Sequence, residues 1–383
     1  MEIYLDNSAT TRLSEGALEL MTKIFMEDYG NTSSLHKKGF DAEKHIRSAK
    51  DNFAKILKCS KNEIFFTSGG TESNNTAIIG TALHYGSRGH HMITTAVEHA
   101  AVSAPMKFLK SRGWDIDFLS VDETGRIDLS ELDSLLRDDT VLVSIMHVNN
   151  EIGTVEPIEE AGKLIHEKCP NCLFHVDDIQ GFGKIALNPK KLHIDLLSAS
   201  SHKLHGPKGV GLLFIDERAH ISPIILGGGH QNGMRSGTEN VPGVAGFSYA
   251  AAEVYKDIDK NYERIEALRA DFISKISDIP DITVNGSAEH HSPYILSLTV
   301  KDVRAEVFLH ALEDKEIYVS AGSACSSNHP AVSATLKAIN VPAYALDSTV
   351  RLSFSNNTSQ EELDTVSDVL HSIIPMLRKF TRK

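Results

Sequence analysis

The sequence has little of several features that would each point to a particular class of protein. Its 383 residues include only four cysteines, Cys59, Cys169, Cys172 and Cys325, too few for a disulfide framework. No apolar run is long enough to span a bilayer, and the first residues lack the basic-then-apolar layout of a signal peptide. The net charge of −12 argues against direct binding of nucleic acid. We therefore expect a cytoplasmic protein with free thiols, no membrane span and no nucleic-acid partner.

The order of expected elements indicates an α/β fold with a large, mostly parallel sheet. Between residues 63 and 215, short apolar runs alternate with segments of helical periodicity, as in successive βαβ units. Beyond residue 255 a charged helix leads into a smaller unit of mixed strands and helices. A chain of this length typically forms two domains. We predict a large domain at residues 15–255 and a smaller one built from residues 1–14 and 256–383.

One stretch, residues 194–209, combines features that rarely occur together. The apolar segment 194–197 predicts the end of a buried strand, and residues 210–215 predict its neighbour. Between them lie small hydroxyl residues, His202, Lys203 and a glycine-proline turn. A partly desolvated lysine in such a loop can bond a carbonyl carbon as a Schiff base. The alternative is a surface hairpin whose lysine faces water, and this stretch alone does not distinguish the two.

Residues with complementary chemistry follow the neighbouring strands. The glycine pair before Thr71 suits a phosphate at a helix N-terminus, and the ring of His99 suits stacking on a planar ligand. Asn150 can hold a polar substituent, and the carboxylate of Asp177 can keep a ring nitrogen protonated. Singly, Asp177 also fits a helix cap and His99 a buried core residue. Because the carboxyl ends of parallel strands share one edge of a sheet, the set predicts a site for pyridoxal phosphate, with Lys203 bonded to its aldehyde.

Longer stretches of the sequence resemble a known family. They are Tyr4–Thr11, Phe66–Asn75, Val97–Val102, Met146–Gly153, His175–Asp177 with Gln180, Ser201–Lys203 with Gly206–Gly209, Gly227–His230 with Met234–Thr238, Gly322–Ser326 and Val350–Phe354. In these stretches the chain resembles the cysteine desulfurases of the NifS/IscS type, within class V of the pyridoxal-phosphate-dependent aminotransferases. The resemblance runs almost end to end, and the Gly-Ser-Ala-Cys match is specific for the desulfurase branch. It implies fold type I, with the large domain binding the cofactor and the smaller one carrying the catalytic-cysteine loop.

The resemblance also implies a role for each matching residue. Lys203 is implied to bond the cofactor aldehyde, Asp177 to contact the ring nitrogen and His99 to stack on the ring. Of these, Lys203 and His99 are implied to be catalytic, together with Cys325. Gln180 is implied to donate a hydrogen bond to the ring hydroxyl. The remaining implied cofactor ligands are Gly70, Thr71, Asn150, Ser200, Ser201, His202 and Thr238, the last from the other subunit of a homodimer. Asn150 and Arg351 are implied to hold the substrate, because a guanidinium matches its carboxylate through two parallel hydrogen bonds.

Cys325 is the expected nucleophile. It lies among small residues with no apolar side chain to anchor them, whereas a buried structural cysteine normally has apolar neighbours. Its thiolate could attack the sulfur of a bound L-cysteine, which would leave a persulfide on Cys325 and release L-alanine. An acceptor protein in iron–sulfur cluster assembly, or in tRNA or cofactor thiolation, would then take the sulfur. The alternatives are a selenocysteine lyase or another class V enzyme, and a non-catalytic scaffold that binds pyridoxal phosphate.

One feature departs from the family pattern, and a second has no role in the proposed site. Asp178 and Ile179 occupy positions where the family usually has small residues, which leaves the packing beside the cofactor ring open. Cys169 and Cys172 form a Cys-x-x-Cys pair flanked by histidines, a spacing that can bind zinc or cycle as a redox pair. A helix end and turn before a strand is the simpler interpretation of that pair, and we predict no metal site.

Overall fold

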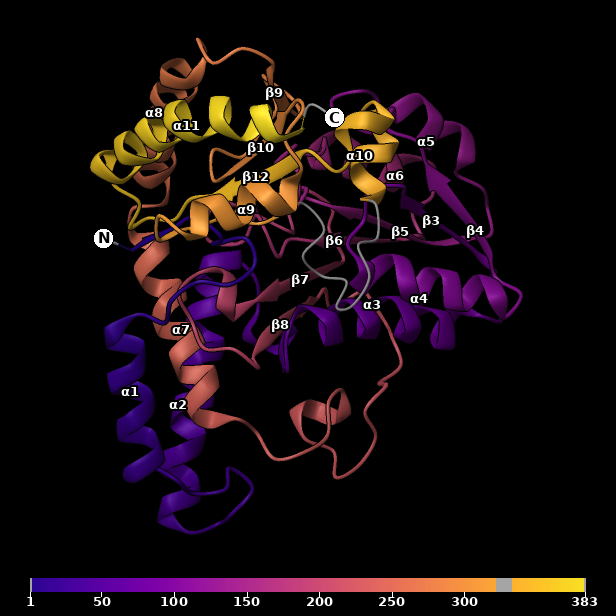
Figure 1. Cartoon of the computed structure of the whole chain (residues 1–383). Helices are drawn as coiled ribbons and strands as arrows, with labels where there is room; N and C mark the ends of the chain where they lie inside the picture. The colour runs from indigo at the N-terminus through magenta and orange to yellow at the C-terminus, as the bar shows by residue number, and fades with distance from the viewer. Residues whose placement is uncertain (1, 322–332, 382–383) are drawn as a thin grey trace.

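The largest element of the computed structural model, which describes residues 2–321 and 333–381, is a sheet of seven strands (Figure 1). In spatial order these are β2 (Ile64–Thr67), β8 (Gly211–Ile215), β7 (Leu196–Ser200), β6 (Leu173–Asp177), β5 (Thr140–Met146), β3 (His91–Thr95) and β4 (Asp115–Leu119). Strands β7, β6, β5, β3 and β4 are parallel, whereas β8 is antiparallel to both of its neighbours. The predicted mostly parallel sheet is confirmed, and β2 points the same way as the parallel strands.

Helices cover both faces of this sheet, which explains why its strands are near-continuous apolar runs (Figure 1). The helices α3 (Gly70–Tyr85) and α4 (Ala100–Ser111) pack on one face. The other face is covered by α2 (Lys37–Leu57), α5 (Leu129–Leu135), α6 (Ile158–Lys168) and α7 (Val241–Lys256), with α1 (Glu15–Met26) packed on α7. Within the described ranges, no helix is both long enough and apolar enough to cross a membrane.

A second group of elements has its own apolar cluster, at the top of Figure 1. Its antiparallel sheet has the order β12 (Thr349–Ser353), β10 (Ile295–Val300), β9 (Ile282–Asn285), and β1 (Ile3–Tyr4) pairs with β11 (Ile317–Tyr318). The helices are α8 (Ile258–Ile276), α9 (Ala305–Glu313), α10 (Ala334–Ala338) and α11 (Gln360–Thr381). Four short 3-10 helices complete the described elements: η1 (Lys61–Glu63), η2 (Ser201–Lys203), η3 (Gln231–Gly233) and η4 (Ala343–Ala345). The cluster joins residues 3–5 to residues 265–377, and the division into domains at residues 14 and 255 stays a prediction.

One predicted strand boundary is wrong. The sequence suggested that a strand ends near Leu197, but β7 begins at Leu196 and continues through the hydroxyl residues to Ser200. Strand β7 is paired on both sides, and the hydroxyl of Ser198 lies 3.0 Å from Nε2 of the buried His175. A hydroxyl with a partner is tolerated in a central strand, so apolar patterning alone ends this strand too early.

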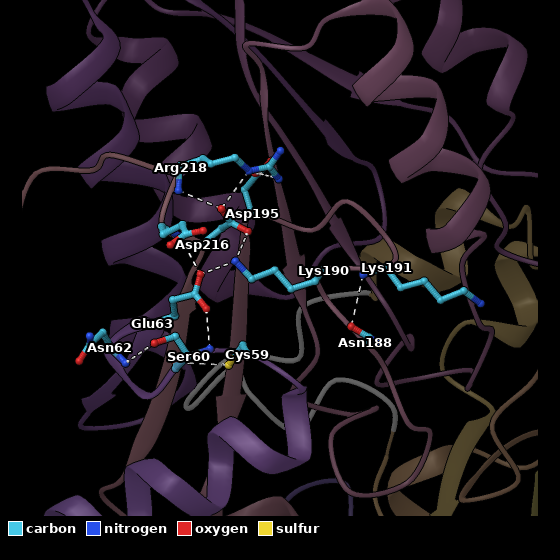
Figure 2. Close-up of polar contacts among 11 residues, drawn as sticks. Cys59, Ser60, Asn62, Glu63, Asn188, Lys190, Lys191, Asp195, Asp216 and Arg218 are labelled. Atoms are coloured by element: carbon cyan, nitrogen blue, oxygen red, sulfur yellow. Dashed lines mark hydrogen bonds and ion pairs between the residues drawn. The ribbon is translucent and has the colours of Figure 1, made fainter.

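The edge where β7 begins is held by a cluster of matched charges, which we call the Lys190 cluster: Glu63, Lys190, Asp195, Asp216 and Arg218 (Figure 2). The ammonium of Lys190 contacts Glu63 and lies 2.8 Å from Asp216, and Arg218 donates to Asp216 over 3.1 Å. Glu63 also accepts from the backbone amide of Ser60, in a capping box at the start of η1. These bonds tie the start of β2 to the end of β8.

Candidate active site

The predicted site residues gather at the opposite edge of the sheet, where β2, β3, β5, β6 and β7 all end. Asp177 is the last residue of β6, and its carboxylate is buried. Its Oδ2 accepts from Nδ2 of Asn74 on α3 at 2.7 Å, and its Oδ1 accepts from the amide of Ile179 at 3.0 Å. Burial raises the pKa of Asp177, and the nearby His99 and Lys203 act in the opposite sense. Three of the predicted residues therefore share one electrostatic environment.

Lys203 lies in η2, directly after β7, and its amine is half-buried rather than facing water as in a surface hairpin. Its Nζ donates to the carbonyl oxygens of Ser8, at 2.5 Å, and Ala9, at 2.9 Å. The side-chain amide of Gln180 donates to the same Ser8 oxygen over 3.0 Å. The segment around Ser8 therefore brings Lys203 and Gln180 together.

The end of the site expected to hold phosphate is formed by the first turn of α3. Gly69 occupies the N-cap position and has no side chain to cap the amides of Gly70 and Thr71. A Cβ on Gly70 would lie 2.1 Å from Cδ1 of Ile179 and 3.6 Å from Cβ of Ser200. The departure at Ile179 thus packs directly on this turn, and a larger residue at position 70 would require the Ile179 side chain to move.

The other predicted phosphate ligands differ in their surroundings. The ring of His202 lies with Nδ1 3.2 Å from the hydroxyl of Thr10, and burial, with Lys203 nearby, lowers its pKa to about 4. That ring is therefore neutral at physiological pH. The hydroxyl of Ser201 is buried against Gly206 and has no hydrogen-bond partner among the described residues. Thr238 is exposed on the loop between β8 and α7, the long loop at the bottom of Figure 1.

His99 occupies the N-cap of α4, and its Nδ1 accepts a hydrogen bond from the amide of Ala101 at 3.1 Å. Because Nδ1 accepts, the proton of the neutral ring is assigned to Nε2. An open cavity of about 520 Å³ adjoins the ring, with Thr71 and Asn75 of α3 on its other side. His99 and the first turn of α3 therefore face a common space.

Arg351 in β12 is buried at the point where the second group of elements meets the site. Its Nη1 donates to the backbone oxygen of Asn150 at 2.8 Å, and its Nη2 donates to Oδ1 of Asp6 at 2.8 Å. Its Nε is buried with no partner among the described residues. An unpaired guanidinium N–H costs free energy when buried, so this position suits an anionic ligand group such as a carboxylate.

The structure adds residues that the sequence reasoning did not assign. Asp6, Ser8 and Asn74 hold Arg351, Lys203 and Asp177 respectively. Asp6 and Ser8 fall in the matching stretch Tyr4–Thr11, and Asn74 falls in Phe66–Asn75, so the signal was present but gave no role. Asp178, the other departure, is buried and accepts from Nδ1 of His147 at 2.6 Å. Its carboxylate is therefore used in a contact with His147, the residue that follows β5.

The three cysteines that the structure describes lie in different surroundings. Cys325 lies outside the described residues. Cys169 ends α6 and Cys172 precedes β6, which agrees with the simpler interpretation of the pair, and both are free thiols. Burial raises the pKa of Cys172 well above its ordinary value and raises that of Cys59 to about 12. Among the described residues, no three His, Cys, Asp or Glu side chains form a group that could hold a metal ion.

Comparison with known proteins places this geometry in a family. Residues 3–366 match the aminotransferase class V family. The chain is 42% identical to the cysteine desulfurase IscS of Dictyoglomus turgidum, over 98% of this chain and 95% of the relative. It is 38% identical to the cysteine desulfurase IscS of Methanosarcina thermophila, over 99% and 93%.

Solved structures give the same result for the fold. A NifS-like protein of 36% identity superposes with a TM-score of 0.93, covering 98% of this chain and 100% of that one. A NifS-like protein from Rickettsia africae, at 29% identity, gives a TM-score of 0.88 with the same coverage. The predicted α/β fold of type I is confirmed. The chain belongs to the class V aminotransferase family and, within it, to the cysteine desulfurases of the NifS and IscS type.

Proposed function

We propose that this protein is a pyridoxal-phosphate-dependent cysteine desulfurase that transfers the sulfur of L-cysteine to Cys325 and releases L-alanine. The observation that carries the proposal is the meeting of Lys203, Asp177 and Arg351 at one edge of the sheet. These are an amine, a buried carboxylate and a guanidinium whose Nε–H has no partner among the described residues. Family membership, shared with relatives named cysteine desulfurase, supports the same activity.

The residues present fit pyridoxal phosphate. The uncapped first turn of α3 offers backbone amides to an anion, and the buried Asp177 suits a protonated ring nitrogen. Ser200, which packs beside Gly70, is expected to extend the same anion site together with Ser201 and His202. The bound cofactor supplies an electron sink that weakens bonds at the substrate's α-carbon.

The chain's own residues would position the substrate and move protons around it. Arg351 orients the cysteine by its carboxylate, with Asn150 beside it. Lys203 would hold the cofactor through its aldehyde, and its amine would serve as a base or acid near the substrate's α-carbon. His99, with its proton on Nε2, would stack on the ring and donate from that nitrogen.

Cys325 is proposed as the nucleophile although it lies outside the described residues. Support comes from where the chain is anchored on either side. Ser320 exchanges backbone hydrogen bonds with Arg351, and the hydroxyl of Ser333 lies 2.5 Å from Oε2 of Glu151. In the transfer, the Cys325 thiolate forms the new S–S bond while the substrate's C–S bond breaks. A proton takes the place of sulfur on the carbon, so L-alanine and the persulfide are the only products.

A homodimer is the proposed assembly, with Thr238 of one subunit reaching the phosphate bound by the other. Thr238 is exposed on a long loop, and the base of that loop is tied to its own α3 by the ion pair of Arg235 with Glu72 at 2.9 Å. The open cavity beside Thr71 and His99 could receive such a loop from a second copy. Sedimentation velocity tests whether the protein is a dimer. The Thr238→Ala variant should stay dimeric but retain its cofactor less tightly.

Delivery of the sulfur to an acceptor protein in the cytoplasm completes the proposal. The three described cysteines are free, which fits a reducing compartment. Iron–sulfur cluster assembly and tRNA or cofactor thiolation are the candidate pathways. Partners trapped as mixed disulfides on Cys325 would identify the acceptor.

The decisive experiment supplies L-cysteine and measures alanine and sulfide. Cys325→Ala should keep the yellow colour of bound cofactor and lose persulfide formation, whereas Cys59→Ala should turn over like the parent because its thiol is held protonated. If Cys325→Ala still delivers persulfide sulfur at the parent rate, the assigned nucleophile is wrong. Activity on selenocysteine alone would favour a selenocysteine lyase, and cofactor binding without any turnover would favour a scaffold.

A further inference from the structure

Lys184 is a buried lysine next to the site to which none of the roles above applies. It lies in the turn after β6, and only 6% of its surface is exposed. Its Nζ donates to Oε1 of Gln180 at 3.2 Å and lies 5.7 Å from the ring centre of Tyr294. Among the described residues, no carboxylate lies within ion-pair distance of it. A buried ammonium without a counterion is costly, so its retention calls for an explanation.

The turn that carries Lys184 is held in one position from several sides. Its amide donates to the carbonyl of Gly181 at 2.8 Å, and the amide of Gly183 donates to the hydroxyl of Tyr255 at 3.3 Å. A Cβ on Gly181 would lie 2.2 Å from Oδ1 of Asp178 and 2.3 Å from Nδ1 of His147. The bonded pair of Asp178 and His147 therefore braces the turn, and the amine of Lys184 has little freedom to move.

The two partners of Gln180 together determine which way its side-chain amide points. The carbonyl of Ser8 can only accept, so the amide nitrogen must face it, as it does at 3.0 Å. The amine of Lys184 donates, so the amide oxygen must face Lys184. A turn of the amide by half a revolution would set oxygen against oxygen at one end and N–H against N–H at the other. The observed orientation leaves the second hydrogen of Nε2 available to a ligand.

We propose that Lys184 is a positioning residue that fixes the amide of Gln180 with its N–H toward the ring oxygen of the cofactor. This inference rests on the proposed function, because it takes Gln180 as the residue that contacts that oxygen. A donor at the ring oxygen withdraws charge from it and weakens its hold on the proton shared with the Lys203 nitrogen. Lys184 thereby keeps the Lys203 linkage easier to deprotonate.

The groups around Lys184 change the pKa of its amine. Burial, and then the nearby Lys203 and Arg351, lower its pKa to about 7, against the opposite influence of Asp178. Lys184 in turn contributes to the lowered pKa values of His202 and His205. Near neutral pH the amine exists in both protonation states, and it has N–H groups to donate to Gln180 in either.

The test is a pH titration of the visible absorbance of the holoenzyme, whose midpoint reports deprotonation of the cofactor linkage at Lys203. Lys184→Met removes the donor while keeping the length of the side chain. We expect its midpoint to rise by about one pH unit, because the amide is then held by the Ser8 carbonyl alone and can turn its second N–H away from the ring oxygen. Lys184→Arg retains donors and should stay within about 0.3 units of the parent. Lys184→Gln serves as the second removal variant if the methionine variant does not fold.

Two controls separate positioning from structure and from direct charge. Lys190→Met removes a lysine of the same domain, at the other edge of the sheet, and should lower the unfolding temperature without moving the midpoint. Added to a Gln180→Leu variant, Lys184→Met should move the midpoint, relative to Gln180→Leu alone, by less than half of the shift that it causes in the parent. The share that remains in the double variant measures the direct effect of the Lys184 charge.

The outcomes are distinguishable from failure of the proposed function. A shift below about 0.3 units in folded Lys184→Met, or a full shift that persists beside Gln180→Leu, overturns the positioning role. If the parent protein forms no visible band, or makes no alanine from L-cysteine, it is the proposed function that fails. A normal band, normal turnover and an unmoved midpoint in Lys184→Met refute the inference alone.

Discussion

The two edges of the seven-stranded sheet treat charge in opposite ways. At the edge in Figure 2, Lys190 and Arg218 are matched by Glu63 and Asp216. Burial lowers the pKa of Lys190, but its hydrogen bonds to Asp216 and Glu63 outweigh this and the pKa is raised. At the other edge, the amine of Lys184 contacts the side-chain amide of Gln180 and the ring of Tyr294, with no carboxylate beside it in the described part of the chain, and its pKa is lowered to about 7.

The difference separates charges that stabilise the fold from charges available to a ligand. The Lys190 cluster satisfies its own groups, whereas the site edge keeps buried atoms without partners among the described residues, such as Nε of Arg351 and the hydroxyl of Ser201. Unsatisfied polar atoms cost stability and persist where a ligand completes them. Substitutions at the two edges should therefore affect different quantities.

The largest effect is expected from Lys203→Ala at the site edge. Loss of the amine removes both the cofactor linkage and the nearby proton donor and acceptor, so kcat/KM for L-cysteine should fall at least about ten-thousandfold. The yellow band should disappear as well. Steady-state alanine production and the absorbance spectrum measure the two effects.

Lys190→Ala is the matched control, because it removes a lysine of the other edge. It should keep kcat/KM within about twofold and lower the unfolding temperature. Near-normal turnover in Lys203→Ala, or a comparable loss in Lys190→Ala, would break the distinction between the edges.

Glu156, which follows β5 at the site edge, should give a stability effect that grows with pH. Its Oε2 accepts from the amide of Ile127 at 3.0 Å, while its buried Oε1 has no partner among the described residues. Burial raises its pKa to about 8. The folded protein therefore holds this proton more tightly than the unfolded chain does, and it loses stability as pH rises from about 4.3 to about 8.

Glu156→Gln removes that loss. The stability of the variant relative to the parent should rise by about 1.4 kcal/mol for each pH unit across this window and then level off. Urea unfolding at a series of pH values measures it. A difference that does not depend on pH would mean that Glu156 ionises in the folded protein as it does in water.

Arg351→Lys tests the substrate end of the site edge. A lysine retains the charge but not the paired N–H groups, so it cannot hold Asp6, Asn150 and a carboxylate together. We expect kcat/KM for L-cysteine to fall about a hundredfold, mainly through KM. Arg218→Lys in the Lys190 cluster should leave both constants unchanged, and an unaltered KM in Arg351→Lys would contradict the assigned role.

Asp216→Asn should give the smallest effect, with the opposite dependence on pH. Burial alone raises the pKa of Asp216, but hydrogen bonds from Lys190 and Arg218 hold it below its ordinary value. Its contribution is therefore present above about pH 3.9 and is lost as pH falls through the folded pKa. The variant should be about 2 kcal/mol less stable than the parent at neutral pH and nearly equal to it in acid.

Urea unfolding at the two pH values measures the Asp216→Asn effect. An equal loss at both would show that packing rather than charge holds this edge.

Local patterns in the sequence predicted most of the fold. The alternation of apolar runs and helical segments between residues 63 and 215 predicted the large, mostly parallel sheet and the helices between its strands. The site edge followed from the order of strands, because parallel strands must end together. What local patterns could not supply were contacts between distant segments. Asp6 pairs with Arg351 across 345 positions, and Ser8 accepts from Lys203 across 195.

Lys184 shows the same limit most clearly. In sequence it is an ordinary lysine between a glycine and an isoleucine, with nothing to distinguish it from a surface residue. Its burial and its bond to Gln180 become visible only in the folded structure, in the turn after β6. Asp178 was noticed as a departure, but its partner His147 could not be predicted, because the pair forms between two strand ends 31 positions apart.

The bond between Asp6 and Arg351 joins segments that are made early and late during synthesis of the chain. Domains fold as units while the ribosome extends the chain from its N-terminus. The residues around Asp177 and Lys203 emerge well before β12, so a nascent chain could assemble the cofactor side of the site while Arg351 is still unmade. The substrate's carboxylate would have no guanidinium to bind until β12 joins the segment around Asp6. A partly made chain that has already taken up its cofactor would thus be unable to hold cysteine in the reactive orientation.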